Sequence, residues 1–324
     1  MRSWNVPQTW IAADSPDATR PGGPGRIPSG LSALLILAVM VAAVLVGCDD
    51  EKTVTDVPDR KPEKLVVLAT VYPLADLARE IGGEHVAVEW LAEGGQPLPG
   101  NEPPESAHGR ARGSDVVVSS GESWATEGFD DPMRVGRVVR LDVLPSAASA
   151  RSPRGLMWLD PAVAREAAEE LYKSFALKRP RYETYFRQRR DHFLDRLESV
   201  IKPYESVLKT DPPRVALVLS PDFARLLQRY NIAEVGLKED VTSSNLTAAQ
   251  VRELRDLARQ YRLTEVLVST ETPPAVIDDL QKRTDLTART LERLGTSAGV
   301  GRNSYLDMLR YNLDQLNQAA SRGD

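Results

Sequence analysis

The stretch from residue 160 to residue 208 constrains the fold most strongly, because it carries the longest run of helical signals in the chain. Asp160 followed by Pro161 is typical of a helix start, a capping acceptor and then a residue suited to the first helical position. A break is predicted at Lys178-Arg179-Pro180, because a proline cannot donate a backbone hydrogen bond. The second helix, of about 28 residues, would span about 40 Å and could run along two small domains.

One face of this second helix is apolar. Its apolar and aromatic side chains recur at three- and four-residue steps, which places them on one side of a helix. They are Tyr182, Tyr185, Phe186, Phe193, Leu197, Val200, Ile201, Tyr204 and Leu208, with the aliphatic part of Arg189. The opposite face carries Arg187, Arg190, Asp191, Asp195 and Glu198. We expect the first face to be buried and the helix to act as a rigid connector.

In the segments on either side of the connector, predicted strands alternate with predicted helices. Runs rich in β-branched residues and leucine predict strands at 64–70, 85–91 and 115–120 before it, and at 214–220, 233–237, 265–270 and 287–291 after it. Thr247 and Gln250 form a capping box, and Asp222 is interpreted as a helix cap. Strands that alternate with helices predict mainly parallel sheets. The fold class is therefore α/β, with two small lobes joined by one long connector helix and a ligand cleft between the lobes.

The predicted organisation of the chain has six parts. They are a disordered leader (1–30), a signal and lipobox (31–48), a tether (49–63), an N-terminal α/β lobe (64–160), the connector helices (161–209) and a C-terminal α/β lobe (210–324). With 324 residues, 42% of them hydrophobic, the chain can bury one large core or two ordinary ones.

Composition narrows the function further. The formal net charge of −5 gives no overall basic field, which argues against nucleic acid as a partner. The single cysteine, Cys48, excludes an internal disulfide framework. It ends a charge-free apolar run, 31–46, whose length of about 16 residues suits an export signal better than a membrane span. Leu45-Val46-Gly47-Cys48 resembles the lipobox of bacterial lipoproteins, so Cys48 is the expected lipidation site. An uncleaved N-terminal anchor is the alternative.

Four stretches together carry a resemblance to a known family. They are Ala69-Thr70-Val71-Tyr72-Pro73-Leu74, Trp158-Leu159-Asp160-Pro161, the connector helix, and the run from Ser304 to Leu313. They resemble the zinc- and manganese-binding lipoproteins that serve ABC uptake transporters. The resemblance implies two α/β lobes bridged by one helix, a metal held by three histidines and one carboxylate, an ABC permease as partner, and a monomer anchored to the membrane by lipid.

The metal site departs from the family pattern. Leu98, Leu156 and Pro221 stand at the three positions where the resemblance implies histidines. Glu292 stands where the family has an acidic ligand. Leucine and proline side chains donate nothing to a borderline metal such as zinc. The sequence therefore predicts a degenerate metal site.

Few other residues offer ligands. His85 and His192 are interpreted as surface or packing residues, and His108 as a relocated ligand only if metal binding proves tight. Glu102 and Glu271 could join the Glu292 carboxylate in an oxygen-only site, which would suit manganese, magnesium or calcium better than zinc. No cofactor is predicted beyond a divalent metal, which these carboxylates would hold only weakly.

Catalysis is not supported by any motif. Gly121-Glu122-Ser123-Trp124-Ala125 follows a strand as a nucleophile elbow would, but no helical pattern follows it and no histidine and acid stand at usable places. We therefore expect an exported, membrane-anchored solute-binding protein on the periplasmic or cell-envelope side. It resembles the metal receptor of an ABC uptake transporter with a degenerate site. The alternative is a relative that binds no metal and uses the cleft for an organic ligand or a protein partner.

Overall fold

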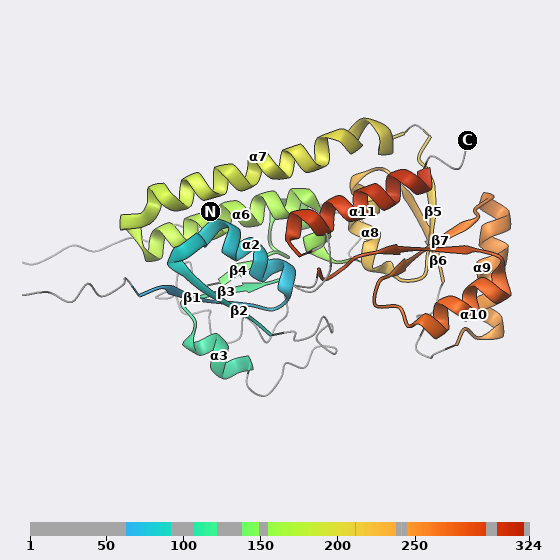
Figure 1. Ribbon diagram of the computed structural model, residues 1–324, viewed down its shortest axis with the longest axis horizontal. Helices are drawn as coiled ribbons and strands as arrows, with labels where there is room; N and C mark the ends of the chain where they lie inside the picture. Colours follow the sequence, from blue (N-terminus) through green and yellow to red (C-terminus); the bar gives the residue numbers. More distant parts are fainter. Residues whose placement is uncertain are drawn as a thin grey trace, which may run out of the picture. The chain divides into compact units, whose positions relative to one another are not determined.

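The computed structural model describes residues 63–91, 107–121, 138–148, 155–210, 212–237, 241, 245–295 and 303–320. All of them belong to one compact unit, Arg60–Asp324. They form two four-stranded parallel sheets with covering helices (Figure 1). In sequence order, a pair of long helices follows the first sheet and precedes the second. This is the predicted α/β class with two lobes and a connector.

The first sheet has the strand order β2-β1-β3-β4. Its strands are β1 (Leu65–Ala69), β2 (Val86–Trp90), β3 (Val116–Ser119) and β4 (Val138–Arg140). All neighbours are parallel, and β1 sets the register, with Leu65 beside Val86 and Val67 beside Val116. The central strand β3 is buried throughout, as its unbroken apolar run predicts. Strand β4 has no counterpart among the predicted strands, because three residues are too few to show a period.

Short helices accompany this sheet: α2 (Tyr72–Gly82), η1 (Gly83–His85), α3 (Ala107–Gly113) and α5 (Pro145–Ala148). Helix α2 begins with a proline in its first turn and ends before Gly83, whose φ is +53°. A side chain at Gly83 would also collide with the Tyr185 hydroxyl of the connector. This glycine therefore lets α2 end directly against the connector helix.

The second sheet repeats the first, with the order β6-β5-β7-β8. Its strands are β5 (Val215–Val218), β6 (Ala233–Gly236), β7 (Glu265–Ser269) and β8 (Thr287–Leu291), which lie inside the four predicted runs. The chain leaves β5 toward β6 on one side, and β7 lies on the other side. The carboxyl ends of β5 and β7 therefore form a topological switch point, where open parallel sheets bind ligands.

The helices of this lobe are η6 (Pro221–Phe223), α8 (Ala224–Arg229), α9 (Ala248–Tyr261), α10 (Pro274–Thr284) and α11 (Tyr305–Ala320). The predicted capping box of Thr247 and Gln250 is present at the start of α9. The prediction that Asp222 caps a helix is wrong. Ser220 is the cap, since its Oγ accepts a hydrogen bond from the Asp222 backbone N–H at 3.4 Å, which leaves the Asp222 carboxylate for another partner.

The connector consists of α6 (Pro161–Lys178), η5 (Pro180–Tyr182) and α7 (Glu183–Leu208). Asp160 caps α6 by accepting a hydrogen bond from the Ala162 backbone N–H at 2.9 Å, and the helix ends at the predicted break. The predicted apolar face of α7 is the buried one: Phe186, Phe193, Leu197, Val200, Ile201 and Leu208. Helix α7 packs against α6, against α2 of the first lobe and against α11 of the second. It therefore joins the two lobes through one shared core.

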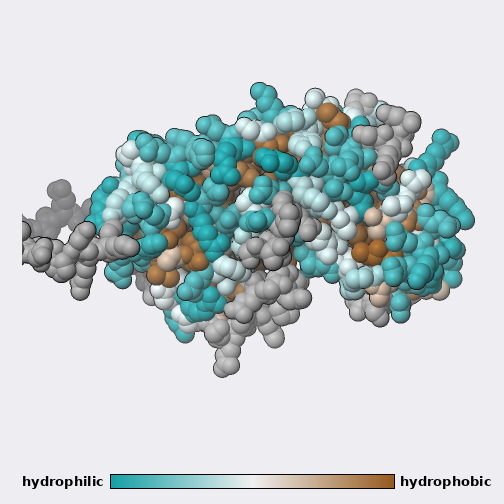
Figure 2. Space-filling view, in the orientation of Figure 1, coloured by the Kyte–Doolittle hydropathy of each residue, from teal (hydrophilic) through white to brown (hydrophobic). Residues whose placement is uncertain are grey.

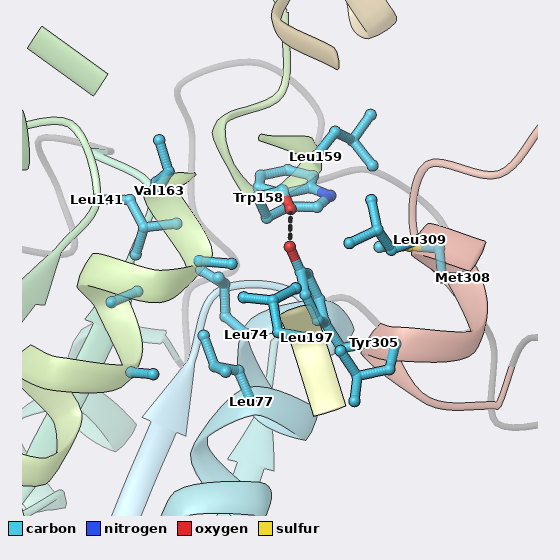
Figure 3. Packing of buried hydrophobic residues seen from close by; sticks show 14 of the residues in the cluster. Leu74, Leu77, Leu141, Trp158, Leu159, Val163, Leu197, Tyr305, Met308 and Leu309 are labelled. Carbon is cyan, nitrogen blue, oxygen red and sulfur yellow. Dashed lines mark hydrogen bonds between the residues drawn. The ribbon is translucent and has the colours of Figure 1, made fainter. Parts of the chain in front are cut away.

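Tyr305 fixes the start of α11 within this core (Figure 3). Its hydroxyl donates to the Trp158 carbonyl at 2.6 Å, and its backbone N–H donates to Asp76 Oδ2 of α2 at 2.7 Å. Trp158 lies on η4 (Met157–Leu159), just before the connector. Burial raises the pKa of the Asp76 carboxyl, and burial likewise raises the pKa of the Tyr305 hydroxyl. Helix α11 is therefore held by polar contacts from the first lobe as well as by apolar packing.

The face shown in Figure 2 is mostly hydrophilic, with apolar residues in small separate groups. Within the described ranges, no helix has both the length and the apolar character needed to cross a membrane.

Candidate functional site

A pocket of about 280 Å³ lies at the carboxyl ends of β5 and β7, at the switch point of the second sheet. One part of its wall is apolar and consists of Leu219, Pro221, Val241, Pro273 and Val276. The other part is polar and consists of Ser220, Asp222, Ser269, Glu271, Thr272 and Arg293. Every one of these residues belongs to the second lobe.

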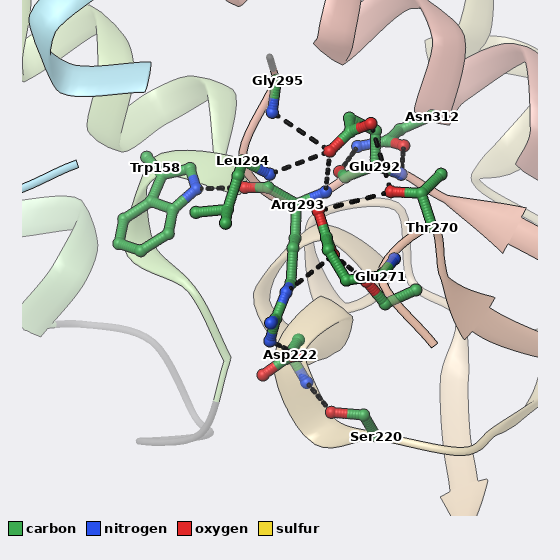
Figure 4. Close-up of polar contacts among 11 residues, drawn as sticks. Trp158, Ser220, Asp222, Thr270, Glu271, Glu292, Arg293, Leu294, Gly295 and Asn312 are labelled. Atoms are coloured by element: carbon green, nitrogen blue, oxygen red, sulfur yellow. Dashed lines mark hydrogen bonds and ion pairs between the residues drawn. The ribbon is translucent and has the colours of Figure 1, made fainter. Parts of the chain in front are cut away.

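Arg293 is the central polar group of this wall (Figure 4). Its Nε donates to Glu271 Oε2 at 2.8 Å, and its Nη1 donates to Asp222 Oδ2 at 2.9 Å. The three side chains are only 18%, 25% and 21% exposed, in the order Arg293, Glu271, Asp222. A guanidinium therefore lies between two carboxylates that follow different strands, where each ion pair is largely shielded from water.

Glu292, the residue at the family's acidic position, is turned toward the backbone. Its Oε1 accepts hydrogen bonds from the backbone N–H groups of residues 293, 294 and 295, each at 3.1 Å. Its Oε2 accepts from Thr270 Oγ1 at 3.1 Å. Glu292 is only 4% exposed and does not line the pocket. Backbone N–H donors therefore stabilise its negative charge.

Glu271 differs from Glu292 because it faces the pocket. Burial is the main cause that raises the pKa of the Glu271 carboxyl, and the nearby Glu292 charge raises it too. Hydrogen bonds from Ser269 and the Arg293 guanidinium act in the opposite direction. The ionised form of Glu271 therefore depends on Arg293.

The backbone that carries Glu292 and Arg293 is fixed from two sides. Asn312 of α11, which is fully buried, accepts from the Glu292 N–H at 2.7 Å and donates to the Glu292 carbonyl at 2.6 Å. The Trp158 indole N–H donates to the Arg293 carbonyl at 2.6 Å. These contacts hold the loop after β8 in one position, so the Arg293 side chain enters the pocket from a rigid base.

The structure brings two of the three altered ligand positions to this site. Pro221 lines the pocket, and the Leu156 backbone N–H donates to the carbonyl of the adjacent Asp222 at 2.8 Å. Leu98 and Glu102 lie outside the described residues, as does Cys48. The loop that contains Leu98 is therefore not part of the described structure, and its side of the predicted cleft is not described.

The histidines have other places. His85 stacks on Tyr182 with a centroid distance of 3.7 Å, and it meets Tyr185 edge to face at 4.7 Å. His192 is exposed on α7, and the side chain of His108 in α3 is outside the described part of the structure. Within that part, no three His, Cys, Asp or Glu side chains are grouped so that they could hold a metal ion.

The pocket therefore offers carboxylate oxygens that already carry hydrogen bonds from an internal cation. A divalent ion bound by Glu271 and Asp222 would have to displace the Arg293 guanidinium. Metal binding by Glu292 and Glu271 stays a prediction. The roles of Asp222 and Arg293 are not among the predictions from the sequence, although one signal for them is present. Charged residues lie within four residues of the carboxyl ends of three strands of one parallel sheet, and such residues meet at the same edge.

Comparison with known proteins supports the resemblance seen in the sequence. Residues 67–319 match the family model described as the periplasmic zinc-uptake complex component A. The chain is 20% identical over 314 residues to the zinc-binding lipoprotein AdcA of Streptococcus pneumoniae, covering 89% of this chain and 61% of AdcA. It is also 20% identical over 314 residues to the high-affinity zinc uptake system protein ZnuA of Bacillus subtilis, covering 89% of this chain and 96% of that protein.

Solved structures show the same fold. The crystal structure of Zn(II)-bound AdcA from Streptococcus pneumoniae has a TM-score of 0.66 at 20% identity, over 80% of this chain and 58% of AdcA. The metal-dependent lipoprotein YcdH from Bacillus subtilis also has a TM-score of 0.66, at 19% identity, over 79% of this chain and 99% of that one. The chain therefore belongs to the family of the periplasmic zinc-uptake complex component A, a family of solute-binding receptors and not of enzymes.

Proposed function

We propose that this chain is an exported, lipid-anchored solute-binding receptor of an ABC uptake system whose metal site is degenerate. In this proposal the protein acts as a monomer, delivers its ligand to an ABC permease, and binds zinc and manganese weakly or not at all. Membership of the family supports the receptor role. The observation that carries the degenerate site is the position of the Arg293 guanidinium between Glu271 and Asp222.

The physical argument concerns charge and ligand type. Zinc sites in proteins are built from imidazole, thiolate and carboxylate ligands, and here leucine and proline stand at the positions of the three imidazoles. The carboxylates that remain near the pocket are engaged, Glu292 by backbone N–H groups and Glu271 by a guanidinium. A metal would therefore gain few ligands and would face a fixed positive charge.

Calorimetric titration of the metal-stripped, full-length protein in detergent tests this proposal directly. We expect neither zinc nor manganese to bind with a dissociation constant below about 10 μM, because one or two engaged carboxylates cannot replace a complete ligand set. Tight binding of one ion per chain at submicromolar concentration would contradict the degenerate site. His108→Ala and Glu102→Ala would then be the first variants to locate the relocated ligands.

The lipid anchor is tested at Cys48. We expect Cys48→Ser to lose labelling by a radioactive or clickable fatty acid and to leave the membrane fraction. The reason is that the lipid chains attached at Cys48 would supply the membrane affinity. Cell fractionation with labelling measures both effects. If the variant loses its label but stays in the membrane, the apolar run 31–46 is itself the anchor.

A further inference from the structure

We propose that the pocket at the carboxyl ends of β5 and β7 binds a small organic cation, a primary amine with a compact apolar body. This inference rests on the proposed function, because it names the solute that a receptor without a metal site would carry. The pocket lies in the second lobe, and all of its lining residues are described in the structure.

The size and walls of the pocket set the size of the ligand. Its volume of about 280 Å³ is just below the range of roughly 300–1,000 Å³ that is typical of sites for drug-sized molecules, so the ligand must be small. The five apolar residues of its wall give the hydrocarbon part of a ligand a surface on which to pack. The polar groups are gathered on the remaining part, around Asp222, Glu271 and Arg293. A ligand with one apolar end and one polar end matches this division.

The charge of the polar wall sets the sign of the ligand. Two carboxylates, Asp222 and Glu271, face a single guanidinium, so the wall carries an unbalanced negative charge when both are ionised. Asp222 Oδ2 accepts from Arg293, while Asp222 Oδ1 accepts no hydrogen bond from any residue in the described ranges. A primary ammonium has three donors and can pair with this oxygen without displacing the arginine.

Other ligand classes fit less well. An anion could approach Arg293 only beside the two carboxylates that already neutralise it. A divalent metal would compete with the guanidinium for the same oxygens. A neutral ligand would shield the carboxylates from water and leave the excess charge uncompensated. A cationic ligand is the one whose binding neutralises the excess negative charge of the pocket.

The test uses three phenyl probes of similar size that differ in charge: benzylamine, benzyl alcohol and benzoate. Each is titrated calorimetrically into the full-length protein in detergent, with detergent alone as the blank. For a probe of this size we expect benzylamine to bind with a dissociation constant of about 0.1–1 mM. Benzyl alcohol and benzoate should bind about tenfold more weakly or not at all.

Two variants locate the site. Asp222→Asn should weaken benzylamine binding about tenfold, which is the effect of losing a charged hydrogen bond. Asp256→Asn, at an exposed position on α9, is the matched control and should bind benzylamine like the unaltered protein. Thr272→Trp should abolish binding by filling the pocket, and it serves if Asp222→Asn fails to fold. Thermal melts of each variant monitor folding.

Preference for benzoate, equal binding of all three probes, or no binding at all would overturn this inference. So would equal affinities of the Asp222→Asn and Asp256→Asn variants. The zinc and manganese titrations separate this outcome from failure of the proposed function. Tight metal binding refutes the degenerate site, whereas absence of both metal and amine binding refutes the amine site alone.

Discussion

Phe193→Ala will lower the free energy of unfolding by about 3–5 kcal/mol, the usual cost of removing a buried phenylalanine ring. Phe193 is 0% exposed on α7, and its ring centroid lies 6.2 Å from that of Tyr305 at the start of α11. Removing the ring leaves a cavity where the connector meets the second lobe. Urea denaturation followed by circular dichroism measures the loss.

The control for this variant is Asp195→Ala, two residues further along the same helix. Asp195 is exposed. A surface change of this kind should cost less than about 0.5 kcal/mol. If both variants proved equally mild, the assignment of the buried face of α7 would be wrong. Because α7 packs against both lobes, a single unfolding transition is expected for the described unit.

Local signals in the sequence were sufficient for most of the fold. The strands are β-branched runs long enough to be recognised, and the connector shows its caps, its proline break and its apolar face. Strand β4 is an element that such local signals do not predict. It has three residues, Val138–Arg140, and it is a strand because it pairs with β3. Its conformation is therefore fixed by tertiary contacts and not by its own pattern.

The side-chain arrangement of the pocket also could not be predicted from local sequence signals. The sequence shows that Glu292 and Glu271 are acidic and that each follows a strand, but it does not show which of them faces the pocket. The structure turns Glu292 toward backbone N–H groups and Glu271 toward Arg293. The pairing of Arg293 with Asp222 joins residues 71 positions apart, and it depends on the order of the strands in the sheet. Charge complementarity across such a distance has no local signature.

Arg293→Ala will destabilise the protein at neutral pH by about 2–4 kcal/mol. This figure is somewhat below the usual cost of breaking a fully buried pair, because the three side chains retain some exposure. The variant leaves Glu271 and Asp222 largely buried without their counter-charge. Arg310→Ala is the matched control, since Arg310 is exposed on α11 and its only ion pair in the described structure is a contact of 3.9 Å with Asp307. Its cost should be below about 0.5 kcal/mol.

The loss of unfolding free energy in Arg293→Ala should depend on pH. The raised pKa of the Glu271 carboxyl determines the direction of this dependence. Burial already raises the pKa of the Glu271 carboxyl above its ordinary value of 4.5, and removing the guanidinium raises this pKa further. Between the unfolded and the folded pKa the folded protein binds more protons, so the free energy of unfolding falls as pH rises through that window. The difference between the variant and the unaltered protein should therefore be smaller near pH 5 than near pH 8.

Divalent cations should partly reverse the same loss. With the guanidinium removed, the freed oxygens of Glu271 and Asp222 form a weak oxygen site of the kind that manganese and calcium accept. Millimolar manganese should then raise the urea midpoint of Arg293→Ala, and the rise should grow with the manganese concentration. The urea midpoint of the unaltered protein should stay unchanged. If Arg293→Ala and Arg310→Ala unfolded alike at both pH values, with and without manganese, the guanidinium would not be the cation that balances this pocket.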